Sequence, residues 1–501
     1  MNRLAGAAGL FLASVAGWAT LVASRPGTYW QQSDAVVYRE AGAAVRHGVA
    51  LYAQTFGTAH LPFTYPPFAA LVFATLSPLS FPVWQVILAV SGVCGLVLAA
   101  HAAVRLAVVS PAVTNPAVVR PAADGPAAGA TAGGAGTAGG SRRSRDRRLA
   151  LTFTVAAVGL CLEPVDLTLH FGQINLILMA LVLVDLAAPD TARYKGIATG
   201  IAGGLKLTPL IFIPYLLLTG RVRAAVVGAA SFAGTVAVGF AVLGRDSAGY
   251  WGGQFAQPGD SPVRLVNQSL NGLVLRLAHH DTGAGPAWIV AALAAGVVGL
   301  GAAVAAGRRG LELLGVCLCA VTGLLVSPIS WSHHWVYVVA GLALVIARPA
   351  GPARGGTRGT DRAADHGAPR DGGAGRPPAR LSRVWRTRWV RPVGALAAGA
   401  ALVGLFGWWP LRLGTHGGID PAVGIHPSGL LRLAPHDGGA ELHWTGWQLV
   451  YGDAYVLAAL AFVLGSAGWL VATARRSPRP KPSVAGSRRR ETAAAGPRQY
   501  P

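Results

Sequence analysis

Ten apolar stretches of membrane-spanning length constrain the fold of this chain more than any other feature. A helix needs about 17–25 mostly apolar residues to cross a bilayer. Of the 501 residues, 52% are hydrophobic and only 12% are charged, whereas a soluble domain carries roughly 25% charged residues. This pattern predicts an all-α polytopic membrane protein and excludes a cytosolic enzyme, a disordered tail and a fibrous protein. The predicted spans are residues 4–24, 83–107, 149–163, 171–188, 223–243, 286–306, 310–327, 334–349, 392–410 and 450–474.

Two further apolar segments do not fit a simple crossing. Residues 196–219 have basic residues before and after them, with Lys206 and Pro209 in the middle. If basic flanks stay in the cytoplasm, this segment enters the membrane and returns as two half-length helices that break near Pro209. Broken helices are tolerated where they are buried in protein or line a cavity. We interpret residues 64–80 as a helix that dips into the outer interface, because a full crossing would move the Arg-rich segment 141–148 outside.

Basic residues are unevenly distributed among the connecting segments. With the amino terminus in the cytoplasm, the predicted cytoplasmic segments hold 31 Lys and Arg residues and the external segments hold eight. Because basic loops stay on the cytoplasmic side, both termini are expected in the cytoplasm. The net charge of +22 can also indicate nucleic-acid binding. However, the basic residues form blocks between the spans, so we expect contact with membrane lipid and no nucleic acid.

The chain divides by composition into membrane parts and biased inserts. Residues 111–140 are almost entirely Ala, Gly, Pro, Val and Thr, and residues 350–382 are rich in Gly, Arg, Pro and Ala. Neither insert has the apolar pattern of a core. The expected parts are 1–107 (first helices, external loop and interfacial helix), 108–148 (low-complexity cytoplasmic loop), 149–349 (remaining membrane core), 350–391 (disordered basic loop), 392–474 (last helices with external loop 411–449) and 475–501 (basic cytoplasmic tail).

The first predicted external loop contains an acidic residue, Asp34, at the start of a helical pattern. Apolar residues recur after it at helical spacing, namely Val37, Ala41, Ala44 and Val45. This spacing is typical of a short amphipathic helix lying on the membrane surface. The carboxylate has two possible roles at this stage: it caps the helix, as Ser-Asp pairs commonly do, or it belongs to a site.

Polar residues within or near the predicted spans also have two possible roles. Gln173 and Asn175 stand at the mouth of a predicted span, where amides either bond between helices or bind the hydroxyls of a ligand. An ammonium group in the hydrocarbon region costs several kcal/mol unless it is paired or hydrated. Lys206 is therefore expected either to contact an anionic lipid headgroup or to pin the broken helix through a salt bridge or carbonyl contact.

Two later external segments carry further polar clusters. They contain the amides Asn267, Gln268 and Asn271 and the paired histidines His333 and His334. Amides and charged groups are typical of carbohydrate sites, because hydroxyls need directional donors and acceptors. The guanidinium of Arg276 presents a fork of donors that suits a phosphate, and paired histidines can be ligands, phosphate contacts or acid–base groups.

The sequence gives no sign of a nucleotide, metal or cofactor. It has no Walker or dinucleotide fingerprint and no Asp-x-Asp pair, and its four cysteines all lie in apolar stretches without zinc spacing. We therefore expect no cofactor and no metal. An amide-rich external face above a bundle accessible to lipid favours a lipid-borne donor.

Six motifs, in this order, resemble one enzyme family. They are SDAVVYREAGAAVRHGVALY, LPFTYPPFAALVF, FGQINLILMALVLVDL, GIATGIAGGLKLTPLIFIPYLLLTGR, VNQSLNGLVLR and SPISWSHHWVY. The chain resembles, over about residues 1–345, the actinobacterial polyprenol-phosphate-mannose-dependent α-(1→2)-mannosyltransferases of glycosyltransferase family 87, which have the GT-C fold. This resemblance implies a GT-C-like bundle of about 12 membrane helices, including a broken pair of half-helices, with external catalytic loops.

The resemblance also implies a reaction and roles for the residues above. A polyprenyl-phosphate-mannose donor would transfer mannose to a mannosylated lipid or lipoglycan on the external face of the plasma membrane, with inversion and with Asp34 as general base. The donor phosphate would be held by Arg276, His333, His334 and Lys206, and the sugar or acceptor by Tyr65, Gln173, Asn175, Asn267, Gln268 and Asn271. The alternatives are transfer of another lipid-linked sugar, such as an arabinofuranosyl unit, or a transporter or flippase whose translocation site includes Lys206.

Overall fold

Helices form almost all of the regular structure in a computed structural model of the chain. The structure describes residues 3–24, 32–108, 134–256, 261–281, 285–347, 396–407, 430–436 and 438–476. The first half has the helices α1 Arg3–Ser24, α3 Ser33–Arg46, α4 Pro67–Leu76, α5 Phe81–Val108, α6 Gly134–Gly159, α7 Glu163–Phe171, α8 Asn175–Leu186, α9 Ile197–Leu205, η3 Thr208–Ile211, α10 Phe212–Leu218 and α11 Val222–Val242. The second half has α12 Gly244–Trp251, η4 Gln254–Ala256, α13 Leu270–Ala278, α14 Gly285–Arg308, α15 Glu312–Val326, η5 Ser332–Tyr337, α16 Val338–Ile346, η6 Leu430–Leu433, η7 Ala440–His443, α18 Trp447–Gly452 and α19 Ala454–Arg476. The strands β1 Thr55–Phe56 and β2 Leu61–Pro62 pair antiparallel, with Thr55 opposite Pro62.

Five of the described helices are long and apolar enough to cross a membrane: α1, α5, α11, α14 and α19. Helices α7 and α8 pass the same test together but are bent by 120°. This confirms the prediction of an all-α, multi-pass membrane protein, whereas the described residues do not contain about 12 spanning helices. The other apolar helices are shorter: Pro67–Leu76, Thr208–Leu218, Glu312–Val326, Ser332–Ile346 and Leu396–Phe406. At 1.5 Å per residue, none of these shorter helices alone matches a hydrocarbon core of about 30 Å.

The limits of two predicted spans, 149–163 and 171–188, differ from those observed. Residues 134–148, which were expected in a cytoplasmic loop, form the first part of α6, and this helix ends at Gly159. The expected external loop 164–170 is instead the buried helix α7. Pro in the first turn of α7 favours a new helix start, and a left-handed glycine ends it, so the chain breaks twice where hydropathy alone indicates continuous spans.

The segment 196–219 is broken as predicted. Helix α9 ends at Leu205, Lys206 is extended with φ −155° and ψ 134°, and η3 and α10 follow. Helix α9 packs closely on α11, where a Cβ atom placed on Gly200 would lie 2.3 Å from the carbonyl oxygen of Gly228. Small residues allow such close helix packing in membranes. Whether this segment re-enters the same side of the membrane stays a prediction.

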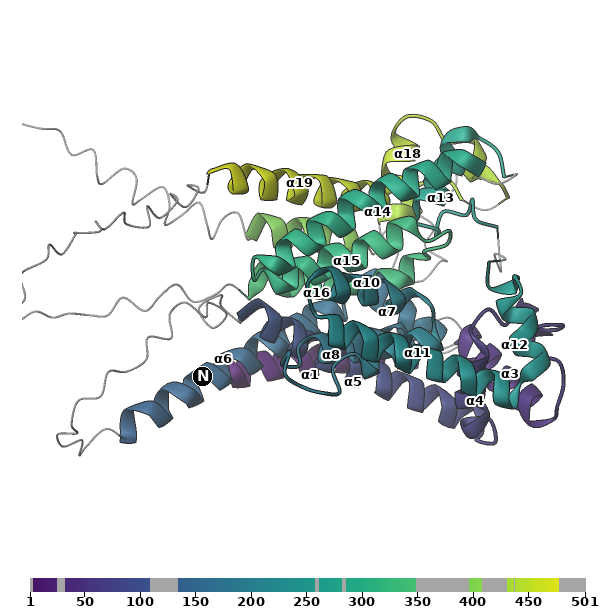
Figure 1. The fold of residues 1–501 in the computed structure, drawn as a ribbon, viewed down its shortest axis with the longest axis horizontal. Coiled ribbons are helices and arrows are strands. Elements are labelled where there is room, and N and C mark those ends of the chain that lie inside the picture. The colour runs from purple at the N-terminus through teal and green to yellow at the C-terminus, as the bar shows by residue number, and fades with distance from the viewer. Residues whose placement is uncertain are drawn as a thin grey trace, which may run out of the picture.

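The two ends of the bundle differ in the elements they carry (Figure 1). Helices α3, α4, α12, α13 and α18 gather at one end, on the right in Figure 1, whereas the start of α1, the start of α6 and the end of α19 lie toward the other. Which end faces the cytoplasm stays a prediction. The predicted loop 350–391 and most of the tail 475–501 lie outside the described residues, as do residues 109–133 and most of the external loop 411–449.

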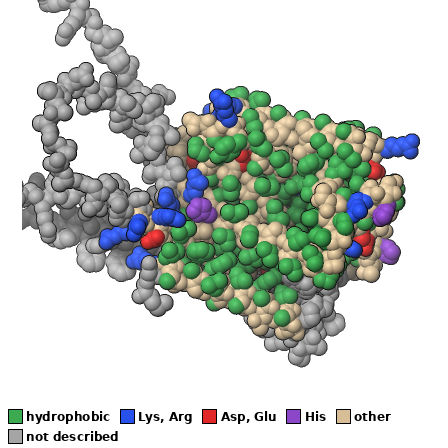
Figure 2. Space-filling view, turned by 90° about the horizontal axis from the view of Figure 1, so that it is seen from below, with side chains coloured by type: hydrophobic (Ala, Val, Ile, Leu, Met, Phe, Trp, Pro, Cys, Tyr) green, Lys and Arg blue, Asp and Glu red, His purple; other side chains and the backbone are tan. Residues whose placement is uncertain are grey.

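The lateral surface is largely apolar. Figure 2 shows a face covered mainly by hydrophobic side chains, with charged and histidine side chains mostly toward its two edges. Individual apolar side chains are well exposed on several spanning helices, for example Val90 of α5 at 58%, Val226 of α11 at 59% and Val297 of α14 at 75%. Such extensive apolar exposure is costly in water, which fits a surface covered by lipid.

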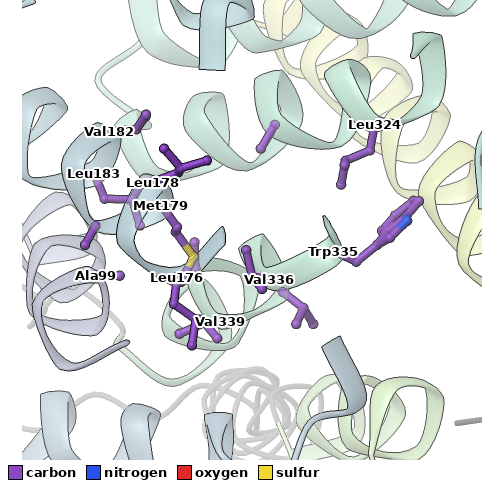
Figure 3. Close-up of a cluster of buried hydrophobic side chains, with 14 of the residues drawn as sticks. Ala99, Leu176, Leu178, Met179, Val182, Leu183, Leu324, Trp335, Val336 and Val339 are labelled. Atoms are coloured by element: carbon purple, nitrogen blue, oxygen red, sulfur yellow. The ribbon is translucent and has the colours of Figure 1, made fainter. Parts of the chain in front are cut away.

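Figure 3 shows a cluster of buried apolar side chains contributed by several helices. It includes Leu176, Leu178 and Met179 of α8, Leu324 of α15 and Val336 of η5. The two site-bearing segments are therefore anchored by adjacent core residues: Asn175 precedes the α8 residues, and the paired histidines precede Val336. Tight packing of this kind holds neighbouring polar groups in fixed positions.

Candidate active site

Asp34 lies in the first turn of α3, and its side chain is not the helix cap. The residue at the N-cap is Gln32, which adopts a left-handed conformation with φ 44° and makes no side-chain capping hydrogen bond. The capping interpretation of Asp34 is therefore wrong. Its Oδ2 instead accepts a hydrogen bond of 2.8 Å from Nε2 of Gln173. The predicted amphipathic helix is confirmed, with Val37 and Ala41 on its buried face.

Gln173 is placed by the sharp turn between α7 and α8. Its backbone N–H donates to Thr168, and that of Gly172 donates to Leu169, which is the Schellman pattern that ends many helices. Gly172 has φ +69°, and a Cβ atom there would lie 2.8 Å from Cβ of Ala35. Glycine is thus needed both for the backbone conformation and for the close approach of α3, which brings Asp34 to the turn.

Two tyrosines surround the carbonyl end of the Gln173 amide. The hydroxyl groups of Tyr38 and Tyr65 lie 2.9 Å and 2.8 Å from Oε1 of Gln173 and 2.7 Å from each other. Tyr65 was predicted to be a site residue, whereas Tyr38 was missed. Its position was informative, because residues four apart share one face of a helix, and Tyr38 follows Asp34 by four.

Lys206 lies near Tyr65, at the break after α9. Its Nζ donates to Oδ1 of Asn175 at 2.8 Å and lies 3.1 Å from Nε2 of His334. The ammonium group also sits 5.3 Å from the centre of the Tyr65 ring, within cation–π range. An ammonium has three N–H donors. Among the described residues, only Asn175 and His334 hydrogen-bond to Lys206, so one donor remains for a ligand.

The paired histidines have different environments. His334 accepts from the ammonium of Lys206, since lysine can only donate, and its ring proton is therefore on Nδ1. His333 is 7% exposed, and its backbone carbonyl accepts from Thr168 at 3.0 Å and from Asn175 at 3.1 Å. Nδ1 of His334 and Nε2 of His333 are buried without a hydrogen-bond partner among the described residues.

A small cavity of about 40 Å³ lies beside this cluster. Asn175, Thr208, His334 and Tyr337 are its polar lining residues, and the rest of its lining is apolar, from α8, η3, α10, α15 and η5. The unpartnered buried nitrogen of His334 would gain from a polar group placed nearby, because such atoms carry a desolvation cost.

The environment of Asp34 brings the pKa of its carboxyl group close to neutral pH. Burial raises the pKa of Asp34 from 3.8 to about 6, and the hydrogen bond from Gln173 and the positive charge of Lys206 partly oppose this rise. Burial also raises the pKa of both Tyr38 and Tyr65, so both hydroxyls stay protonated donors. A general base works best when its pKa is close to the working pH, and Asp34 meets this condition.

Arg276 does not join this cluster. It is fully buried, and its Nε donates to Oδ1 of Asp453 at 3.0 Å. Nη1 donates to the carbonyls of Val263 and Arg264, and Nη2 donates to the carbonyl of Asn267 and to Asp453. A guanidinium has five N–H donors, and all five are used. The structure thus corrects the prediction of Arg276 as a phosphate ligand, because no donor remains.

The amides Asn267, Gln268 and Asn271 are also engaged within the protein. Asn267 donates to Pro262 and accepts from the backbone of Ser330, and Asn271 donates to Pro328. Gln268 donates to the carbonyls of Leu265 and Gly452 and accepts from the backbone of Tyr455. The side chains of these amides hold loops together. The structure therefore does not support the prediction that they bind the sugar.

These loop contacts support the histidines indirectly. Asn267 forms an antiparallel bridge with Trp331, and the N–H of Ser332 donates to the carbonyl of Val266 at 2.8 Å. The backbone just before His333 is therefore fixed by the segment that carries the amides.

Of the predicted residues, the structure brings together Asp34, Tyr65, Gln173, Asn175, Lys206, His333 and His334. The described residues contain no group of three or more His, Cys, Asp or Glu side chains that could hold a metal.

Comparison with known proteins decides the family. The family model of glycosyltransferase family 87 matches residues 63–328, which is more than half of the chain. The chain belongs to glycosyltransferase family 87. This confirms the resemblance drawn from the six motifs, and the match includes all the clustered residues except Asp34, Tyr38, His333 and His334. No solved structure gives a significant match.

Several curated mycobacterial proteins are similar to this member of the family. One from Mycobacterium tuberculosis, a polyprenol-phosphate-mannose-dependent α-(1-2)-phosphatidylinositol mannoside mannosyltransferase, is 33% identical over 289 residues, 57% of this chain and 62% of the relative. One from Mycolicibacterium smegmatis, named for phosphatidylinositol pentamannoside, is 32% identical over 306 residues, 59% of this chain and 63% of the relative. The chain thus matches less than two thirds of the length of these two relatives.

Proposed function

We propose that the protein is a glycosyltransferase that moves mannose from a polyprenyl-phosphate-mannose donor to a mannosylated glycolipid, forming an α-(1→2) linkage. The observation that carries this proposal is the cluster in which a carboxylate, Asp34, and an ammonium, Lys206, both lie near Tyr65. Attack of an acceptor hydroxyl on a glycosyl phosphate needs a base on one side and a cation on the other. The relatives named for phosphatidylinositol mannosides support the choice of donor and acceptor class.

In the proposed reaction, Asp34 takes the proton of the acceptor hydroxyl as its oxygen forms a bond to the anomeric carbon. The bond from that carbon to the phosphate oxygen breaks, and the electron pair leaves with the phosphopolyprenol. A single displacement inverts the anomeric centre, so a β-linked donor yields an α-linked product. A positioned base contributes about 10²–10⁴-fold to the rate.

In the proposed complex, the phosphate of the donor binds at Lys206. Its remaining N–H is the donor to a phosphate oxygen that gains charge as the bond breaks, and stabilisation of such charge is a major part of catalysis. His334, whose Nε2 accepts from the ammonium of Lys206, orients this group. The proposed site opens on the external face of the plasma membrane, with both termini in the cytoplasm. The distribution of basic residues between the loops supports this orientation.

The test is transfer of radiolabelled mannose by the protein in detergent or nanodiscs, from mannosyl phosphopolyprenol to a phosphatidylinositol mannoside. The product is expected to be a mannolipid from which an α-(1→2)-mannosidase releases the label. Asp34→Asn is expected to abolish transfer, and Lys206→Met to reduce it about 10²–10³-fold. Arg245→Met, which removes an exposed cation of α12, is the matched control and is expected to retain transfer. Full activity of Asp34→Asn would refute the proposed mechanism.

A further inference from the structure

The side chain of Gln173 is occupied by protein groups on both sides of its amide. Its Oε1 lies within hydrogen-bond distance of the hydroxyls of Tyr38 and Tyr65, and its Nε2 donates to Asp34. An amide oxygen has two lone pairs and an amide nitrogen has two N–H groups. The two phenols therefore fill the acceptor side, and Gln173 has little capacity left to bind a sugar hydroxyl directly.

The chemistry of its neighbours decides which way this amide points. An ionised carboxylate only accepts hydrogen bonds, whereas a protonated phenol donates one. With Nε2 toward Asp34 and Oε1 toward the tyrosines, the amide N–H faces an acceptor and the amide oxygen faces donors, and the two phenolic protons are shared between Oε1 and the contact of the hydroxyls with each other. If the amide rotated by 180°, its oxygen would face the Asp34 carboxylate, and that arrangement is tolerated only when Asp34 is protonated. The two hydroxyls therefore act on Asp34 through Gln173.

We propose that Gln173 is a positioning residue for the base: Tyr38 and Tyr65 hold its amide so that its N–H keeps Asp34 ionised and oriented toward the acceptor. This inference rests on the proposed role of Asp34 as general base. It assigns a different task to Gln173 and Tyr65 from the sugar contact indicated by the sequence. Oδ2 of Asp34 is used by Gln173, and Oδ1 has no hydrogen-bond partner among the described residues, so Oδ1 takes the acceptor proton.

Within the part of the chain that the structure describes, three titratable groups face Asp34. Tyr38 lies on its own helix, Tyr65 lies just before α4, and Lys206 lies after α9. The tyrosines are neutral, so Lys206 is the charge that acts on Asp34 in parallel with the Gln173 hydrogen bond. Loss of the Gln173 amide leaves the Lys206 charge in place, which keeps the two effects separable.

The experiment measures kcat and KM across pH 5–9 for mannosyl transfer by the full-length protein. Gln173→Leu removes the N–H that stabilises the ionised carboxylate and is expected to shift the acidic midpoint of kcat upward by about one pH unit. The double variant Tyr38→Phe with Tyr65→Phe leaves Gln173 intact but frees its amide, and it is expected to shift the midpoint in the same direction. KM for donor and acceptor is expected to change less than twofold in both variants.

The matched control is Tyr52→Phe. Its hydroxyl donates to the backbone carbonyl of Tyr65 and does not touch Gln173, so the midpoint is expected to stay at the wild-type value. An unshifted midpoint in Gln173→Leu, or a raised KM with an unshifted midpoint, would overturn the proposal and return Gln173 to a structural or sugar-binding role. Failure of the underlying mechanism is recognised separately, since Asp34→Asn would then retain transfer. Variants that unfold are identified by size-exclusion chromatography, and the tyrosine variants, which keep both rings, then provide the test.

Discussion

Replacing Asp34 by asparagine is expected to make the folded protein more stable while it abolishes transfer. The carboxylate is largely buried, and burial raises its pKa from 3.8 to about 6 in the folded state. The folded protein therefore binds this proton more tightly than the unfolded chain does. Stability from this group is greatest below the unfolded pKa and falls as the pH rises through the folded pKa.

The size of the effect follows from these two values. Each pKa unit corresponds to 1.36 kcal/mol, so the ionised carboxylate lowers the free energy of unfolding by about 3 kcal/mol above pH 7. An asparagine carries no charge, and its Oδ1 can still accept the hydrogen bond from Gln173. We therefore expect Asp34→Asn to be about 3 kcal/mol more stable than the wild type at pH 8 and less than about 1 kcal/mol more stable at pH 4.

The assay is thermal or denaturant unfolding of the purified protein in detergent at both pH values. Asp281→Asn, which removes an exposed carboxylate, is the matched control and is expected to leave stability within about 0.5 kcal/mol of the wild type. A variant at position 34 that is less stable than the wild type at pH 8 would refute the reasoning. A gain that is equal at pH 4 and pH 8 would also refute it, because the gain would then not come from ionisation.

Two further predictions concern the supports of the site. Asp453→Ala leaves the guanidinium of Arg276 buried without its partner, which typically costs about 3–5 kcal/mol, so loss of folded protein is expected by size-exclusion chromatography; a normal yield would contradict this. Gly172→Ala adds a Cβ atom 2.8 Å from Ala35 at a position with φ +69° and is expected to reduce kcat at least tenfold by separating Asp34 from Gln173. Gly439→Ala is the matched control, because Gly439 is also left-handed, with φ +82°, but its added Cβ meets no atom within 4 Å; equal losses in the two variants would remove the argument from close approach.

Local sequence patterns predicted much of the secondary structure. The period of apolar residues after Asp34 correctly indicated an amphipathic helix, and Pro209 beside Lys206 correctly indicated a broken one. Both features depend on residues within one or two helical turns. An interruption between the spans 149–163 and 171–188 was predicted, but the loop 164–170 is the helix α7 and the breaks lie on either side of it; hydropathy over a long window averages a short polar turn into its apolar surroundings.

Residue type was a weaker guide to the site. Arg276, His334 and Lys206 were equally plausible phosphate ligands by chemistry alone. The structure separates them, because the five donors of Arg276 are satisfied by Asp453 and three carbonyls, whereas one donor of Lys206 is free among the described residues. Asp453 lies 177 residues from Arg276, and no local pattern connects the two positions.

The sequence by itself determined that this chain forms apolar helices in a membrane, which of its loops are basic, and that it carries the motifs of glycosyltransferase family 87. These properties are sums over neighbouring residues, so they can be read along the chain. Only the tertiary structure decided which polar side chains remain available to a substrate. That availability depends on donors and acceptors meeting across helices, as Gln173 meets Asp34 from 139 residues away, and such pairing is a property of packing in three dimensions.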